Sequence, residues 1–195
     1  MKQKIILASS SPRRKELLTQ LIGNNFDIMP SDYVEDNTEK IKPIELILKQ
    51  ATGKAKSVAK NLKNGIVIGA DTLVLLNGVV LGKPQKAPQA KGMLKMLSGK
   101  TVDVVTGVTV IDIENKKEVS DCEITKVYIK NLSTIEINDY VKTKEPLDKA
   151  GAFAIQGIGA SIVERIEGDF SNVVGLPLFL LTQLFSRLGI SIYDL

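Results

Sequence analysis

Three consecutive cationic residues stand where a helix is expected to begin. Arg13, Arg14 and Lys15 follow Ser11 and Pro12 in the stretch LASSSPRRKELL. Serine is a favoured N-cap, and proline fits the first helical position. Because a helix N-terminus carries partial positive charge and free N–H groups, cations there are locally unfavourable unless an anion binds. The pattern therefore indicates a phosphate-type anion site; the alternative is that the basic side chains extend into solvent.

Two carboxylates are candidates for metal or proton chemistry. Asp71 directly follows the apolar run Ile66-Val-Ile-Gly-Ala, so it is predicted at the end of a buried strand, where catalytic residues are common. A carboxylate there suits binding of a divalent cation or general-base action toward water, and the alternative is a role in a turn or cap. Glu35, in the acidic loop 32–36, would join a metal site only if the fold brings it to Asp71.

Three further polar residues could serve either a functional or a purely structural role. Lys83 lies in Leu81-Gly-Lys-Pro84, where glycine allows a close backbone approach and lysine suits phosphate; the alternative is a surface turn. Lys54 has small neighbours in a predicted helix and would reach a cleft or simply be solvated. Gln156 lies in the glycine-containing segment 144–157, and its amide would read a base edge or satisfy loop backbone.

The composition excludes several classes of chemistry. There is no histidine, so Ser-His-Asp and Cys-His triads and histidine-ligated zinc sites are excluded. Carboxylates, lysines, arginines, hydroxyls and oxygen-bound hard metals remain. The net charge of +4 is mild and fits an anionic ligand. Aromatic residues make up 5% and tryptophan is absent, which does not favour nucleic acid as a partner.

The chain is expected to work in a reducing compartment. Cys122 is its one cysteine, so no internal disulfide is possible, and we expect a packed or partly exposed thiol and a cytoplasmic location. The apolar residues near the N-terminus are too few for a signal-peptide core. The longest apolar stretch, 173–185, is shorter than a membrane span, so no membrane partner is expected.

Periodicity and turn signals predict helices and strands mixed along the chain. Hairpins, the clearest at Asn77-Gly78, imply antiparallel pairing, so the expected fold class is α/β or α+β with a mixed sheet. The capping box of Ser133 and Glu136 predicts a helix start. The first predicted helix begins at Pro12, and the other four span about 43–62, 88–97, 133–142 and 178–188. The predicted strands are 4–8, 26–29, 66–71, 73–76, 79–81, 102–113, 118–129, 153–156, 161–166 and 190–193.

Six segments together resemble the Maf family of nucleoside triphosphate pyrophosphatases. In chain order they are LASSSPRRKELL, VIGADTLV, LGKPQ, SGKTVDVVTGV, KEPLDKAGAFAIQG and GDFSNVVGLPL, covering the range from Leu7 to about Leu178. The combination is specific, although no single piece is. The segment GAFAIQG with Gln156 resembles the subgroup that acts on dTTP and UTP.

The resemblance implies a fold and a reaction. The fold would be a single domain over residues 1–195, with two lobes around a central cleft, shared with the inosine triphosphate pyrophosphatases. The reaction would be hydrolysis of dTTP and UTP to the nucleoside monophosphate and pyrophosphate with Mg²⁺ or Mn²⁺. CTP and modified pyrimidine nucleotides are further candidate substrates. The role would be nucleotide-pool housecleaning, and a homodimer is the default expectation.

The resemblance also assigns roles residue by residue. Asp71 would accept the proton, and Glu35 with Asp71 would hold the metal. Arg13, Thr72 and Gln156 would select the substrate. The phosphate-binding residues would be Ser9, Arg13, Arg14, Lys15, Lys54 and Lys83. The alternative function is a nucleotide- or nucleic-acid-binding regulator of cell division and septum formation with weak hydrolysis.

Overall fold

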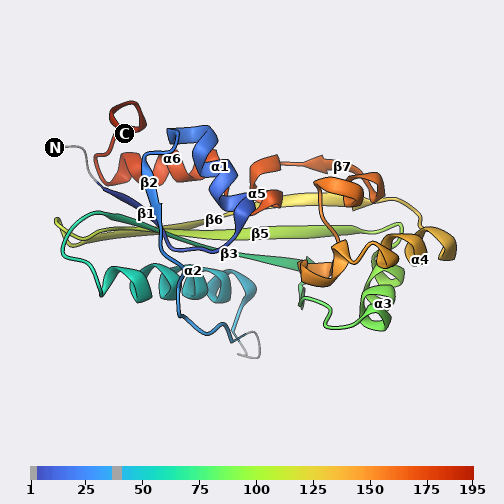
Figure 1. Cartoon of the computed structure of the whole chain (residues 1–195). Helices are drawn as coiled ribbons and strands as arrows, with labels where there is room; N and C mark the ends of the chain where they lie inside the picture. Colours follow the sequence, from blue (N-terminus) through green and yellow to red (C-terminus); the bar gives the residue numbers. More distant parts are fainter. Residues whose placement is uncertain (1–3, 37–40) are drawn as a thin grey trace. The chain divides into compact units, whose positions relative to one another are not determined.

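The computed structural model describes residues 4–36 and 41–195, and it alternates strands and helices along most of the chain (Figure 1). The elements are, in order, β1 (Ile5–Leu7), α1 (Pro12–Ile22), β2 (Phe26–Ile28), α2 (Pro43–Ala59), β3 (Ile66–Leu76), β4 (Val79–Leu81), α3 (Ala87–Leu97), β5 (Thr101–Asp112), β6 (Lys117–Ile129), α4 (Thr134–Lys142), the 3-10 helices η1 (Glu145–Asp148), η2 (Ala150–Ala152) and η3 (Gly157–Ile162), β7 (Val163–Glu167), α5 (Phe170–Val174), α6 (Leu178–Arg187) and η4 (Ile192–Asp194).

The strands form a seven-stranded mixed sheet in the order β2-β1-β3-β5-β6-β7, with β4 pairing to β3. β1 is parallel to both of its neighbours, with Ile5 opposite Phe26 on one side and Ile66 on the other. β4 is antiparallel to β3, and β7 is antiparallel to β6. All residues of β1 are buried, and its sequence is a continuous apolar run, as is typical of inner parallel strands. The expected α/β class with a mixed sheet is confirmed.

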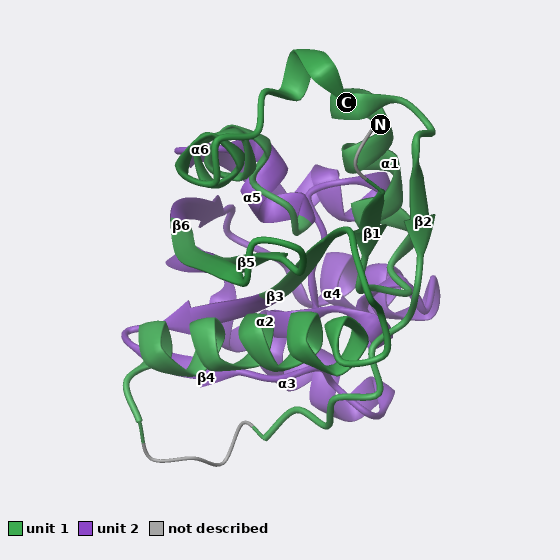
Figure 2. Ribbon diagram, turned by 90° about the vertical axis from the view of Figure 1, so that its left-hand side faces the viewer, with its two compact units in different colours: residues 1–71, 106–123, 175–195 green, residues 72–105, 124–174 purple. Residues whose placement is uncertain are grey.

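The chain divides into two compact units (Figure 2). Unit 1 comprises residues 1–71, 106–123 and 175–195, and unit 2 comprises residues 72–105 and 124–174. The strands β3, β5 and β6 each contribute residues to both units. The expectation of a single domain with two lobes over residues 1–195 stays a prediction.

In unit 1, helices cover both faces of the strands. α2 lies on one face, and α1 and α6, which contact each other, lie on the opposite face (Figures 1 and 2). The backbone of α2 approaches the strands closely because two of the facing residues are glycines. A Cβ on Gly69 of β3 would lie 2.4 Å from the carbonyl oxygen of Ala51, and one on Gly107 of β5 would lie 2.9 Å from that of Ile47. Neither position has room for a side chain.

In unit 2, α3 and α4 pack together and help to enclose the core. Buried residues of these helices, of the strands and of η2 meet in one apolar cluster. Its members include Leu76, Leu94, Leu97, Val104, Val127, Ile137, Tyr140 and Phe153. The apolar residues of α3 and of α4 recur at helical spacing, so each helix has one apolar face. Burial of these faces accounts for the position of both helices.

Local start and turn signals act as the sequence predicts. Ser11 caps α1, accepting a hydrogen bond from the backbone N–H of Arg14 at 3.5 Å. Ser133 and Glu136 form the expected capping box at the start of α4. At the β3–β4 turn, Asn77 and Gly78 have φ of 51° and 79°, the left-handed conformation that a tight hairpin turn requires.

The longest apolar stretch is divided between two helices. Gly175 and Pro177 separate α5 from α6. Gly175 has φ of 124°, a backbone conformation that glycine adopts readily and other residues rarely adopt. α6 buries Leu181, Leu184 and Phe185. Among the residues that the structure describes, no helix is long and apolar enough to cross a membrane.

Four of the predicted strands are wrong: two do not form, and two are parts of one strand. Residues 153–156 form no strand, because Gly151 and Ala152 have φ of 66° and 61° and turn the chain before Phe153. Residues 190–193 likewise form no strand: η4 begins after Ser191, whose side chain accepts from the N–H of Tyr193. Finally, 66–71 and 73–76 are one strand, since 74–76 pair with β4. Asp71 therefore lies within β3, not at its end.

The close packing at Gly69 predicts a specific loss of stability. We expect Gly69→Ala to lower the free energy of unfolding by about 1–3 kcal/mol, because the added methyl meets backbone atoms that cannot move aside. Denaturation in urea measures this change. Gly92→Ala is the matched control on α3, where an added Cβ meets nothing within 4 Å, and it should be neutral or stabilising. Equal effects of the two substitutions would contradict the packing argument.

Candidate functional site

The ammonium of Lys54 lies between two carboxylates in unit 1. Its Nζ donates to Oε1 of Glu35 at 2.5 Å and to Oδ1 of Asp71 at 2.7 Å. The side chains of Lys54 and Asp71 are 12% and 8% exposed, whereas that of Glu35 is 35% exposed. Charges this far from solvent interact strongly with one another. The structure thus brings together three of the residues that the sequence singled out.

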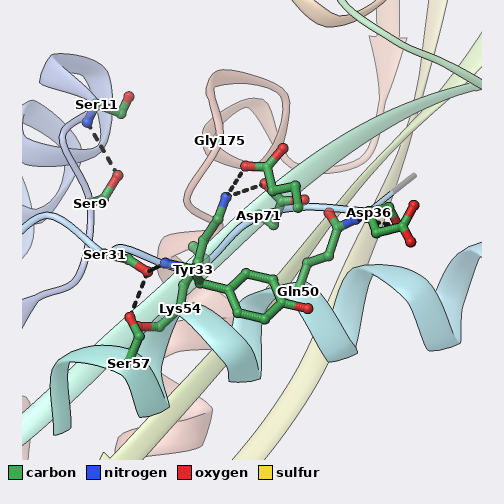
Figure 3. A network of polar contacts seen from close by, with 12 residues as sticks. Ser9, Ser11, Ser31, Tyr33, Asp36, Gln50, Lys54, Ser57, Asp71 and Gly175 are labelled. Atoms are coloured by element: carbon green, nitrogen blue, oxygen red, sulfur yellow. Dashed lines mark hydrogen bonds and ion pairs between the residues drawn. The ribbon is translucent and has the colours of Figure 1, made fainter. Parts of the chain in front are cut away.

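Two elements of unit 1 fix the inner pair of this cluster. Lys54 projects from α2 and Asp71 from β3 (Figure 3). The close approach of α2 at Gly69 brings the helix within reach, so a lysine side chain spans the remaining distance to Asp71. The separation of 17 residues along the chain gives no local signal for this pair.

The loop that carries Glu35 is held along α2. Ser31 Oγ and Ser57 Oγ lie 2.7 Å apart, and Ser31 Oγ also accepts from the N–H of Tyr33 at 3.0 Å (Figure 3). The Tyr33 ring covers Gly53, where an added Cβ would lie 2.3 Å from the ring. Sequence reasoning missed these contacts. The helical spacing of Gly53 and Ser57, next to a lysine of interest, is the signal that would have pointed to them.

At the start of α1, Arg14 binds main-chain carbonyl groups. Its Nε donates to the carbonyl oxygen of Gly175 at 2.8 Å, and its Nη1 donates to that of Ala70 at 2.8 Å and to Ser9 Oγ at 3.5 Å. Ser9 Oγ also accepts from the N–H of Ser11 at 3.2 Å (Figure 3). Arg14 therefore ties the loop after β1 to β3 and to the segment before α6.

Burial and neighbouring charges have opposite effects on the pKa of Arg14. Burial lowers its pKa below the ordinary arginine value, although the carboxylates of Asp71 and Glu35 act to raise it. A guanidinium in this setting still carries its charge at neutral pH. Arg13, beside it, is half-buried and Lys15 is exposed. The positive charge expected at this helix start is thus present, with Arg14 turned inward.

The pair of carboxylates fits a hard divalent cation. Oxygens of Glu35 and Asp71 already converge on one cationic group, the Lys54 ammonium. Magnesium is commonly held by one or two carboxylates together with substrate phosphates. Within residues 4–36 and 41–195, no group of three His, Cys, Asp or Glu side chains is placed to hold a metal ion. Further oxygen ligands would have to come from a bound phosphate compound.

The remaining predicted site residues belong to unit 2. Thr72 is half-buried on β3, Lys83 is exposed after β4, and Gln156 is exposed just before η3. The turn with Lys83 is linked to the segment 144–157, because the N–H of Gly151 donates to the carbonyl oxygen of Gly82 at 3.1 Å. Two sequence segments with candidate residues are therefore adjacent in this unit.

The fold and the site define an α/β protein with a buried ion cluster near a cationic helix start. A model of the Maf-like protein family matches residues 4–188, so the chain belongs to that family. The resemblance found in the sequence motifs is confirmed over nearly the whole chain.

Curated relatives match over the same length. The chain is 53% identical to the dTTP/UTP pyrophosphatase of Methanosarcina mazei over 98% of both chains, and 52% identical to that of Alkaliphilus oremlandii over 92% of both. Among solved structures, it resembles the Ham1 protein of Staphylococcus aureus with a TM-score of 0.47 and 15% identity, over 65% of this chain and 72% of that one. A structural likeness of that size carries no argument about function.

The contacts of Arg14 predict that it stabilises the free protein. We expect Arg14→Lys to lower the free energy of unfolding by about 1–3 kcal/mol, because buried carbonyl groups lose their donors although the charge is kept. Denaturation without nucleotide measures this. Arg13→Lys makes the same chemical change one residue away and should cost less than about 0.5 kcal/mol. A larger loss in Arg13→Lys than in Arg14→Lys would refute the anchoring role.

Proposed function

We propose that this chain is a nucleoside triphosphate pyrophosphatase that hydrolyses dTTP and UTP to the nucleoside monophosphate and pyrophosphate. CTP and modified pyrimidine nucleotides are further candidate substrates. The reaction removes selected nucleotides from the pool. The observation that carries the proposal is the identity of 53%, over 98% of both chains, with a relative named dTTP/UTP pyrophosphatase.

The ion cluster of unit 1 supports the proton-transfer step. Asp71 is 6% exposed and lies within β3, next but one to the closely packed Gly69, so the strand holds it as a positioned base for a water molecule. The water loses a proton to Asp71 and its oxygen bonds to the α-phosphorus. The bond from that phosphorus to the oxygen bridging the β-phosphate breaks, and pyrophosphate leaves with the electron pair.

Phosphate binding is assigned to the cationic groups and to Ser9. Arg13, Lys15 and the N–H groups of α1 offer donors and positive charge at one helix start. Arg14 contributes its charge and holds Ser9 through the contact at 3.5 Å. Lys54 and Lys83 complete the set, and Lys54 would turn from the carboxylates toward a bound phosphate.

A divalent cation, Mg²⁺ or Mn²⁺, would be held by Glu35 and Asp71. When bound, it neutralises charge on the phosphates and on the leaving pyrophosphate. The support is the convergence of both carboxylates on one cationic group. Lys54 and the metal would then compete for the same oxygens.

Selection of the base is assigned to Arg13, Thr72 and Gln156. Gln156 offers an amide donor and acceptor at an exposed position, which suits the edge of a pyrimidine.

We place the enzyme in the cytoplasm, in keeping with its single cysteine, Cys122. A homodimer stays an expectation.

Product identification tests the reaction directly. Purified protein incubated with UTP or dTTP and Mg²⁺ should give nucleoside monophosphate and pyrophosphate, separated by ion-exchange chromatography. Asp71→Asn should slow the reaction about 10²–10⁴-fold, because the amide cannot accept the proton. Nucleoside diphosphate with free phosphate would show cleavage at the wrong bond. No turnover of UTP, dTTP, CTP or GTP would favour a binding protein instead.

The position of Lys54 predicts an effect on metal binding without any nucleotide. We expect Lys54→Met to bind Mn²⁺ at least about tenfold more tightly than the unchanged protein, because a competing charge within 3 Å of both carboxylates is removed. Electron paramagnetic resonance of free Mn²⁺ measures the affinity.

Lys56→Met serves as the control for this measurement. Lys56 is also on α2 and pairs with a carboxylate, Glu118 at 3.0 Å, but its side chain is 59% exposed. Its loss should leave Mn²⁺ affinity within about twofold, since exposed pairs interact weakly. Unchanged affinity in Lys54→Met would rule out competition between the lysine and the metal.

A further inference from the structure

In unit 2, the carboxylate of Glu145 collects three hydrogen bonds. Its Oε1 accepts from the N–H of Gly159 at 2.8 Å and from the hydroxyl of Tyr140 at 3.0 Å. Its Oε2 accepts from the N–H of Ile158 at 3.0 Å. A half-buried carboxylate thus binds main-chain groups of a segment that begins 12 residues further along the chain, at Gly157.

The bound segment follows Gln156 directly. Gly157 has φ of 69°, and a Cβ on it would lie 2.7 Å from Oε2 of Glu145. This left-handed residue turns the chain from the extended Gln156 into η3, whose first N–H groups Glu145 binds. The direction in which the Gln156 side chain leaves the backbone therefore depends on the turn that Glu145 holds.

Glu145 itself is held from the other side. Tyr140 is 4% exposed in the core on α4, and Thr143 Oγ1 donates to its carbonyl oxygen at 2.6 Å. The N–H of Glu145 donates to the same Thr143 Oγ1 at 3.2 Å. Burial and the nearby Glu145 carboxylate raise the pKa of Tyr140, so its hydroxyl stays a donor throughout the physiological range.

The contacts require a group that only accepts hydrogen bonds. All three partners of Glu145 are donors, and an ionised carboxylate offers two accepting oxygens. A glutamine in this place would present its NH₂ group to at least one of the donors. The turn would lose a bond and gain a repulsive contact, while the size of the side chain stayed the same.

We propose that Glu145 is a positioning residue for selection of the base, acting through Gln156. The inference rests on the proposed function, in which Gln156 reads the base edge. In this role Glu145 contacts neither the phosphates nor the attacking water. Its role is to fix the backbone that directly follows one exposed amide, which lowers the freedom lost when the amide binds a base.

The test is a double-mutant cycle with Glu145→Gln and Gln156→Ala. We expect Glu145→Gln to raise KM for UTP about tenfold with kcat within about threefold, because one hydrogen-bonded turn is lost and the chemical step is untouched. The preference for UTP over GTP should fall by the same factor. In the Gln156→Ala background, Glu145→Gln should change KM by less than about twofold.

Dissociation constants for UTP and GTP are measured alongside the kinetics, so the test does not depend on turnover. Glu136→Gln is the matched control: Glu136 also accepts a main-chain N–H, at Ser133, but at the start of α4. It should leave the preference unchanged.

Three results would overturn the proposal. One is an equal loss from Glu145→Gln with and without Gln156, which would mean a general structural role. Another is an unchanged preference in Glu145→Gln. The third is an unchanged preference in Gln156→Ala, which would place the error at Gln156. If the unchanged protein does not hydrolyse UTP but binds it in preference to GTP, and Glu145→Gln reduces that preference, the proposed function would be refuted and the role of Glu145 supported.

Discussion

The close approach of α2 to the strands of unit 1 determines where the ionic groups of that unit lie. The helix backbone lies against Gly69 and Gly107, at distances that leave no room for a Cβ. Close packing of backbone on backbone leaves little freedom of rotation or sliding. Lys54 therefore reaches Asp71 from a rigid element, and a charged group on such an element is placed more accurately than one on a loop.

The charges in this cluster depend on one another. An ion removed from water is costly unless it is paired, and loss of one partner leaves the other uncompensated. Asp71 and Lys54 satisfy each other deep in the unit, whereas the more exposed Glu35 is the partner that water or a ligand reaches most easily. All three groups are paired without a ligand, so in the proposed function an incoming phosphate or cation would replace contacts that already exist. The proposed binding would thus be an exchange of partners.

Local signals in the sequence predicted local structure well. The Ser11 cap, the hairpin at Asn77-Gly78 and the capping box at Ser133 each depend on residues within four positions of one another, and the structure confirms all three. The convergence of Glu35 and Asp71 on Lys54 spans 19 and 17 residues and depends on helix packing, which periodicity does not report. The strand predicted at 153–156 failed because a mostly apolar segment need not pair: here turns on either side determine the backbone.

Charged side chains in both units bind main-chain groups next to candidate site residues. Buried main-chain groups need hydrogen-bond partners, and a side chain can supply them where the backbone does not. In unit 1 the guanidinium of Arg14 donates to carbonyl groups, and in unit 2 the carboxylate of Glu145 accepts from N–H groups. Each is the ion whose hydrogen-bonding character is complementary to the groups it meets. The segments that present Ser9 and Gln156 thus have charged neighbours that hold their backbone. By this route a charged residue can affect ligand binding without touching the ligand.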